Sequence, residues 1–280
     1  MKTFLSYVVS IILAILIVLI FFMELFSNTI LNKYYVINKL EKNNYYTKIN
    51  NQVKINFENY IYQSGLEDDI LYNIINEEKI KKDTLLILEN IYDNLDNKID
   101  INEIKDNLEK KINESLGNSN ISEEQKEAID TFIKHICNEY INTIFAFGNG
   151  SQIKNIVTEV NLKMKFMKKI FLIILGIDFI LLIVLNIKKI YKFITFIGIA
   201  LNVSGLTILT INIYINMKIK FNNIVILNDA TTELLGSIIN DVIILINKVG
   251  IIVIVNGSVL IFLSNLIHNL KLYKIDKKNS

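Results

Sequence analysis

One aspartate lies in the middle of a long apolar run, and its position makes it the most chemically unusual residue of the chain. Asp178 is flanked by Leu175, Gly176, Ile177 and Phe179. If this run crosses a bilayer, an ionised carboxylate at its centre costs on the order of 2.5 kcal/mol or more. The side chain is therefore expected to be protonated, to face the interior of a helix bundle, or to have polar partners.

Four polar residues near the middle of two later apolar runs are candidate partners for Asp178. They are Asn202, Ser204, Asn256 and Ser258. Because successive spans alternate in direction, counting from each end places all five residues at a similar depth. Three glycines beside them would allow close helix approach: Gly176, Gly205 and Gly257. Two interpretations stay open: a site for a proton, a cation or a small polar ligand, and hydrogen bonds that hold the bundle together. The second is favoured.

Other reactive residue types are sparse or badly spaced for a catalytic centre. Cys137 is the only cysteine, so it cannot form an internal disulfide or a cysteine zinc cluster, and a buried structural thiol is expected. His135 is two residues away, and such residues point in different directions on a helix. The acidic residues 67–69 match no calcium loop and favour an acidic first helical turn. The sequence thus predicts no catalytic residues, no metal site, no cofactor and no enzymatic activity.

Composition restricts the partners of the chain more than it suggests an activity. The chain has no arginine, proline or tryptophan, and Asn, Ile and Lys dominate it, which is typical of an AT-rich bacterial genome. Without arginine there is no bidentate guanidinium group for phosphate recognition. The formal net charge is only +2, so no strong field attracts a polyanion. No nucleic-acid partner is predicted.

The elements that must position these residues are four apolar runs, each long enough for a helix to cross a bilayer. They cover residues 4–22, 170–187, 193–215 and 249–267. The first is too long for the apolar core of a cleavable signal peptide and is followed by no small-residue cleavage pattern. The predicted fold is an all-α integral membrane protein with four transmembrane helices, in which an α-helical extracytoplasmic domain is inserted between the first and second.

The predicted layout follows from these spans and from the lysines near them. Lysines at 188–192 and in the tail fall on the side of the N-terminus, and cytoplasmic loops carry such an excess. Both termini are therefore predicted to be cytoplasmic, in the plasma membrane, with residues 27–168 outside. The predicted segments are a signal-anchor helix at 1–26, the helical domain at 27–168, spans at 169–187, 193–215 and 242–268, an extracytoplasmic loop at 216–241 and a Lys-rich tail at 269–280.

The inserted domain is long enough for a hydrophobic core of its own. Its pattern predicts five or six helices, one of which opens with a capping box from Ser122 to Gln125. Apolar stripes at both ends of the domain run directly into the first two spans. The first and last helices of the domain are therefore predicted to be continuous with these spans and to pack as an antiparallel stalk. Alternatively, the stripes seal the domain's own core.

The arrangement of one span, a large domain and three further spans resembles the permease subunits of FtsX-like and MacB-like ABC proteins. The resemblance concerns topology alone. Those subunits present cytoplasmic surface to an ATPase, whereas here only residues 1–3 precede the first apolar run and the turn at 188–192 is short. No coupling helix is predicted, and neither is membership of that family.

The sequence therefore predicts a non-enzymatic bacterial membrane protein in contact with the lipid bilayer. Its helical ectodomain would bind a partner or ligand and act on the membrane bundle as a sensor, scaffold or accessory subunit. Another membrane protein or a second copy of the chain would be its partner. The alternative is a transporter or channel subunit that uses the polar level around Asp178. A membrane-embedded hydrolase is least favoured, because no Ser/Lys, Asp/Asp or His-rich constellation can be assembled.

Overall fold

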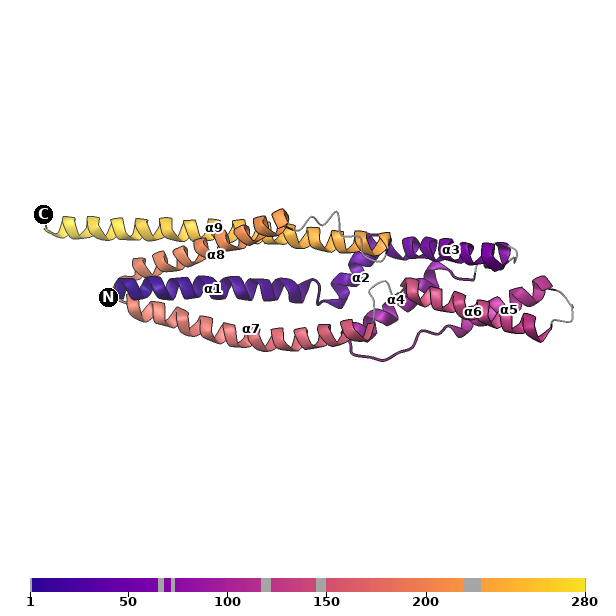
Figure 1. Cartoon of the computed structure of the whole chain (residues 1–280). Helices are drawn as coiled ribbons and strands as arrows, with labels where there is room; N and C mark the ends of the chain where they lie inside the picture. The colour runs from indigo at the N-terminus through magenta and orange to yellow at the C-terminus, as the bar shows by residue number, and fades with distance from the viewer. Residues whose placement is uncertain are drawn as a thin grey trace. The chain divides into compact units, whose positions relative to one another are not determined.

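The computed structural model describes residues 2–64, 68–71, 74–116, 122–144, 150–218 and 228–279, and all regular structure in these ranges is helical (Figure 1). The predicted all-α fold is thus confirmed. The prediction of four helices long and apolar enough to cross a membrane is also confirmed. They are Lys2–Asn28, Ile153–Asn186, Ile190–Met217 and Asp229–Lys271.

The chain divides into two compact units. The apolar unit comprises Met1–Thr29, Asn161–Asn223 and Ile238–Ser280. The polar unit comprises Ile30–Val160 and Ile224–Ser237. The polar unit therefore takes residues from two separate parts of the sequence, of which the second falls in the segment predicted as a loop.

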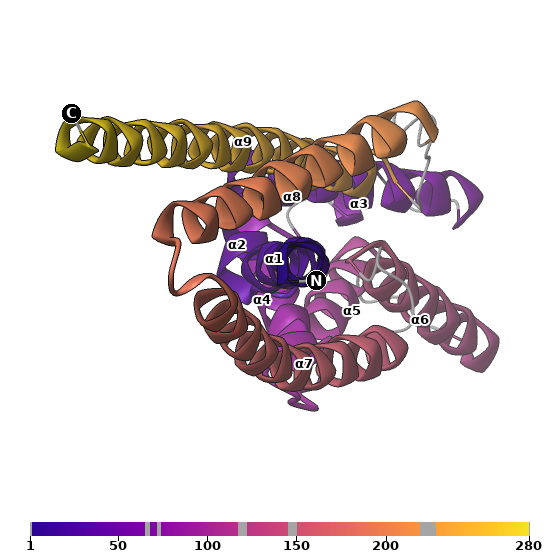
Figure 2. The ribbon, with the colours of Figure 1, turned by 90° about the vertical axis from the view of Figure 1, so that its left-hand side faces the viewer.

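The apolar unit consists of helix α1 (Lys2–Asn28), most of α7 (Gly150–Asn186), α8 (Ile190–Lys218) and most of α9 (Asp229–Asn279). Figure 2 looks along α1 and shows α7 and α8 on either side of it, with α9 against α8. Its larger core cluster is built from these buried side chains: Val9, Leu13, Ala14, Leu182, Phe196 and Ala200. The outward faces of the same helices are also apolar, as in helices that are solvated by lipid.

Polar contacts at both ends fix α1 and α7 as an antiparallel pair. Lys168 pairs with Glu24 near one end, and Asn186 Nδ2 donates to Ser6 Oγ at 3.0 Å near the other. The same number of residues separates the two contacts on each helix, so the pair keeps one register along its length. At about 1.5 Å per residue this length is roughly 27 Å, close to the hydrocarbon thickness of a bilayer.

Helices α8 and α9 are joined by an antiparallel seam whose contacts advance by four and three residues on both helices. This heptad spacing is typical of coiled coils. Gly and polar residues occupy much of the seam, so the backbones approach closely. From one end to the other the facing pairs are Tyr191/His268, Thr195/Ser264, Gly198/Ile261, Asn202/Gly257, Gly205/Ile254, Leu209/Gly250 and Asn212/Asn247.

The polar unit is built around α3, which packs against α4 and α6. The predicted capping box is confirmed, because Ser122 N donates to Gln125 Oε1 at 2.9 Å and Gln125 N to Ser122 Oγ at 3.2 Å. Residues 117–118 and 147–151, where Gly, Asn and Ser favour a break and a loop, lie outside the described residues except for Gly150 and Ser151, at which α7 begins. Besides the first turns of α7 and α9, the elements of this unit are α2 (Lys33–Lys42), α3 (Tyr45–Ser64), the 3₁₀ helix η1 (Asp68–Leu71), α4 (Glu77–Tyr92), α5 (Asn102–Leu116) and α6 (Glu123–Ile144).

The two helices predicted to run without a break into the first two spans differ in continuity. Helix α7 runs unbroken from Gly150 to Asn186. Helix α1 ends at Asn28, and α2 begins four residues after Thr29. The break is stabilised by Asn32, whose side-chain oxygen accepts hydrogen bonds from the backbone amides of Tyr34 and Tyr35 at 3.0 and 3.2 Å. Such an N-cap favours the start of a new helix over continuation of the old one.

The structure also corrects the predicted loop at 216–241. Helix α9 begins at Asp229, and Asn228 Oδ1 caps it by accepting from Thr231 N at 2.8 Å. The first turns of α9 are anchored in the polar unit, since Leu234 is fully buried and Glu233 pairs with Lys48. The sequence favours a short surface helix within residues 228–240 but does not indicate its burial, because the buried partners come from helices almost two hundred residues earlier.

Candidate functional site

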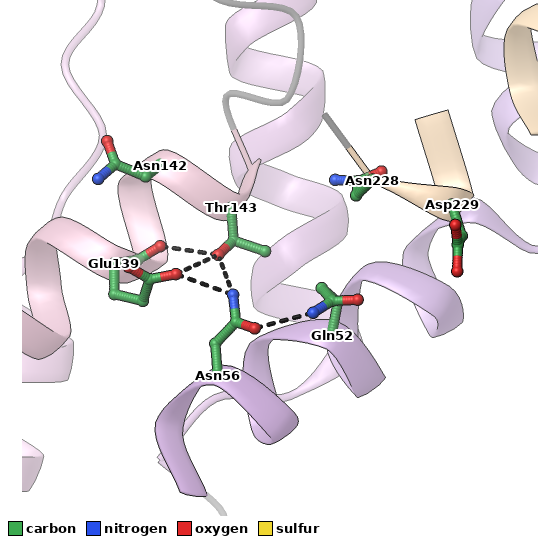
Figure 3. Close-up of a pocket in the computed structure, with 7 residues that line it drawn as sticks. All are labelled: Gln52, Asn56, Glu139, Asn142, Thr143, Asn228 and Asp229. Carbon is green, nitrogen blue, oxygen red and sulfur yellow. Dashed lines mark hydrogen bonds between the residues drawn. The ribbon is translucent and has the colours of Figure 1, made fainter. Parts of the chain in front are cut away.

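A polar pocket of about 360 Å³ lies entirely within the polar unit (Figure 3). This volume falls in the range of about 300–1,000 Å³ typical of small-molecule sites. Every lining side chain is an amide, a carboxylic acid or a hydroxyl. The lining residues are Gln52, Asn56, Glu139, Asn142, Thr143, Asn228 and Asp229.

The α6 wall of the pocket is organised around the carboxylate of Glu139. Asn56 Nδ2 donates to Glu139 Oε1 at 2.8 Å, and Tyr60 OH donates to Oε2 at 3.3 Å. Gln52 Nε2 in turn donates to Asn56 Oδ1 at 2.8 Å. Figure 3 shows Glu139, Thr143, Asn56 and Gln52 as one chain of hydrogen bonds. This network holds the Glu139 carboxylate in place at the edge of the cavity.

Helical spacing explains why these residues meet. Gln52, Asn56 and Tyr60 follow one another at intervals of four on α3, so they share one face. The adjacent face of the same helix carries Val53 and Phe57, which are buried in the core. Packing of α3 against α6 therefore places the polar row of α3 beside Glu139.

The electrostatics of this wall are those of an ionised carboxylate. The negative charge of Glu139 is the largest cause that raises the pKa of Tyr60, and burial and their hydrogen bond add to it. Thr143 Oγ1 donates to the backbone oxygen of Glu139 at 2.8 Å and lies 3.4 Å from its Oε1.

The α9 wall comes from the beginning of that helix. Asn228 is its N-cap, and Asp229 lies exposed in its first turn, where a negative charge complements the helix dipole. Among the described residues, neither Asp229 nor Glu139 forms an ion pair with a cation. The pocket therefore presents two carboxylates and several amide oxygens, and the described part of its lining contains no lysine, histidine or aromatic side chain.

Asp178, the central residue of the predicted intramembrane site, is buried and has no polar partner in the part of the chain that the structure describes. It is 6% exposed, and its Oδ2 is buried without a hydrogen bond. No described residue forms a hydrogen bond or an ion pair with it. The predicted interhelical hydrogen bonds from Asp178 are therefore not among the contacts of the described residues.

The other four predicted residues are only partly brought together. Ser258 Oγ donates to Asn202 Oδ1 at 3.3 Å, which links α9 to α8. Ser204 Oγ instead donates to the carbonyl of Leu201 in its own helix at 2.8 Å, and Asn256 is exposed on α9. Of the three glycines, Gly205 and Gly257 lie at close helix contacts, whereas Gly176 has no neighbour within 4 Å of an added Cβ.

Sequence reasoning missed two further polar contacts in the apolar unit, which lie near opposite ends of α8. Ser10 Oγ donates to the carbonyl of Phe196 at 2.7 Å, and Asn212 Nδ2 donates to Asn247 Oδ1 at 2.6 Å. The signal available was a polar residue on the inward face of each helix. The pocket was missed because its polar residues are ordinary on a water-facing helix and become notable only when α3 and α6 pair.

The structure also describes the cysteine, the nearby histidine and part of the acidic cluster that the sequence singles out. Cys137 is buried, as predicted, and burial raises the pKa of its thiol. His135 is exposed, and in the described part of the chain no three His, Cys, Asp or Glu side chains are grouped to hold a metal. Of the acidic residues 67–69, the first lies outside the described residues, and Asp68 begins the 3₁₀ helix η1.

No protein-family model matches the chain, and no match was found among curated proteins or solved structures. The functional argument therefore depends on the residues and their geometry.

Proposed function

We propose that the chain is a non-enzymatic plasma-membrane protein whose polar unit lies outside the cytoplasm and binds a small organic cation, of the class of protonated amines. It would act as the sensing or accessory part of a membrane assembly. The observation that carries this proposal is the pocket with two carboxylates, Glu139 and Asp229, that have no cationic partner among the described residues.

The chemistry of the lining favours an amine over other ligand classes. Among the described lining residues, an anion would meet two like charges and no cation. A sugar ring would find no aromatic side chain to stack on among these same residues. A protonated amine would instead donate to carboxylate and amide oxygens, and hydrogen bonds to charged groups contribute about 1.5–3 kcal/mol each.

The lysine distribution supports the proposed orientation. Lys188, Lys189 and Lys192 lie in or beside the short turn between α7 and α8, and lysine-rich short loops are usually cytoplasmic. The polar unit would then face the exterior, where a ligand reaches it without crossing the membrane. A response would then pass through another membrane protein or a second copy of the chain.

The test is ligand-dependent thermal unfolding of the full chain in mild detergent, with spermidine as the probe. Binding to the folded state alone raises its stability, by about 2.7 kcal/mol at one hundred times the dissociation constant. We expect spermidine to raise the unfolding temperature of the natural chain. Glu139→Gln keeps the shape of the side chain but removes its charge, so the increase should be lost.

Glu124→Gln is the matched control, because Glu124 lies exposed on the same helix, α6, and outside the pocket. It should keep the full response to spermidine. An equal response in the natural chain and in Glu139→Gln would place spermidine elsewhere and contradict the proposal. A response to calcium chloride instead of spermidine, lost in Glu139→Gln, would make the pocket a metal site and also contradict it.

A further inference from the structure

Asp178 lies midway between the polar contacts that mark the two ends of the α1–α7 pair. It is ten residues from Lys168, which pairs with Glu24, and eight from Asn186, which donates to Ser6. At about 1.5 Å per residue these separations are roughly 15 and 12 Å. In a bilayer with a hydrocarbon core about 30 Å thick, Asp178 is therefore close to the midplane.

The surroundings of Asp178 are apolar. The register of the pair places Asp178 level with Ala14, which is buried in the same cluster as Leu182. Leu175, one turn before Asp178, packs against that cluster as well. Apart from Asp178, the described charged side chains of the helices packed against this cluster all lie outside the apolar runs 4–22, 170–187 and 193–215: Lys2 and Glu24 on α1, Lys154, Glu159, Lys163, Lys165, Lys168 and Lys169 on α7, and Lys192 on α8.

An ionised carboxylate has no compensation at this position. Removing a charge from water without a partner costs several kcal/mol, and protonation removes the charge. A metal cation would not replace the proton, because such ions need several oxygen ligands, and no described residue hydrogen-bonds Asp178. A neutral carboxyl group needs only one acceptor for its O–H.

The same helix already contains an example of such an acceptor. Asn186 Nδ2 donates to the backbone carbonyl of Leu182, four residues earlier, at 3.0 Å. A protonated Asp178 can donate to the carbonyl of Ile174 in the same way, since side chains commonly bond to the preceding turn. The proton would then lie on a carboxyl oxygen, and no other helix would be needed to satisfy it.

We propose that Asp178 is an intramembrane proton-binding site, which holds a proton at neutral pH and is not a hydrogen-bonded link to the polar residues of α8 and α9. An ordinary aspartic acid with a pKa of about 3.9 is ionised under these conditions. The proposal concerns the apolar unit and does not depend on the amine pocket. Reversible proton binding at this depth is the property that the transporter or channel alternative requires.

The test is modification by dicyclohexylcarbodiimide of the full chain in liposomes, followed by peptide mass spectrometry. This apolar reagent takes the proton of a carboxylic acid on one nitrogen, and the carboxylate oxygen bonds to its central carbon. The resulting O-acylisourea rearranges to a stable N-acylurea on the side chain. We expect the label on Asp178 at pH 7, and its yield should fall as the pH of the medium rises.

Glu24 is the internal control, because its carboxylate pairs with Lys168 and should stay unlabelled by this reagent. Asp178→Asn, a neutral residue of the same shape, should lose the label and keep the unfolding temperature of the natural chain. The absence of label on Asp178 at every pH would overturn the proposal. So would labelling of Asp178 by a water-soluble carbodiimide with an amine, because that result would place the carboxylate in water.

The two proposals fail separately. Glu139→Gln should leave the labelling of Asp178 unchanged, and Asp178→Asn should leave the response to spermidine unchanged. Loss of one result with retention of the other therefore identifies which site has been assigned wrongly.

Discussion

A buried aspartate in the polar unit is held by a tyrosine hydroxyl and a lysine ammonium group. Asp83 is 2% exposed, accepts a hydrogen bond from Tyr140 OH at 2.6 Å and lies 3.3 Å from Lys79 Nζ. Lys79 also donates to the carbonyl of Asp100 at 2.8 Å. Burial, and then the hydrogen bond to Asp83, raises the pKa of Tyr140. Removing one member of such a buried group costs about 3–5 kcal/mol because it leaves an uncompensated charge.

Tyr46 gives a prediction about pH at the residue scale. Its side chain is buried, and its hydroxyl has no hydrogen-bond partner among the described residues. Burial raises its pKa to about 12, with a smaller contribution from Glu41. Because the folded-state pKa lies above that of the unfolded chain, its contribution to stability is full below about pH 10 and is lost between about pH 10 and 12.

Tyr46→Phe removes both the buried hydroxyl without a partner and the loss of folding stability that its ionisation causes at high pH. We expect the variant to be at least as stable as the natural chain at pH 8. Its relative stability should rise by about 1.4 kcal/mol between pH 9 and pH 11. Denaturant unfolding of the full chain in detergent measures this difference. Tyr34→Phe removes a hydroxyl from a side chain that is 76% exposed and should not change stability at pH 8; the same rise in both variants would contradict the argument.

At the scale of helices, the α8–α9 seam depends on the absence of side chains. A Cβ added at Gly257 would lie 2.8 Å from the carbonyl oxygen of Gly198, and one added at Gly205 would lie 2.9 Å from that of Gly250. Both contacts involve backbone, which cannot rotate away as a side chain can. The helices must therefore separate when either residue is replaced.

Gly257→Ala is predicted to destabilise the full chain by about 1–3 kcal/mol, as overpacking of a close contact does. The measurement is its thermal unfolding in detergent. The matched control is Gly176→Ala on α7, where an added Cβ has no neighbour within 4 Å. That variant should be neutral or more stable by about 0.5–1 kcal/mol, because alanine favours helix over glycine. Equal effects of the two substitutions would show that the seam does not hold α8 and α9 together.

The sequence was sufficient for elements whose cause is local and insufficient for those with a distant cause. Long apolar runs and the capping box at Ser122 need only neighbouring residues to be recognised. The break before α2 depends on one side chain, Asn32. The apolar stripe continues past this residue, so the sequence pattern predicts an unbroken helix. The start of α9 depends on burial of Leu234 among residues far away in sequence. The pocket likewise depends on the distant pairing of α3 with α6. The lack of a partner for Asp178 among the described residues depends on the register of α7 against α1.

At the scale of the whole molecule, the two units require different solvents. The apolar unit exposes large hydrophobic side chains on its outer faces, among them Ile11, Ile173 and Ile252. The polar unit instead covers its core with charged and amide side chains, and surface ion pairs such as Lys81 with Glu41 contribute little in water. Lipid around the first and water around the second satisfy both surfaces.

The proposed orientation is tested by the position of single cysteines. Cys137 is buried and would be replaced by serine to give a thiol-free background. In intact cells, a membrane-impermeant maleimide should label Glu124→Cys, which lies on the exposed face of α6, and should not label Lys189→Cys until the membrane is permeabilised.

The reverse pattern would place the polar unit in the cytosol and the α7–α8 turn outside, against the distribution of lysines. An external ligand could not then reach Glu139, so the sensing role would be lost even if spermidine bound the purified chain. Labelling of both cysteines in intact cells would mean that no membrane separates them. Asp178 would then lie in a bundle that is not solvated by lipid, and the reason for its proton would also be lost.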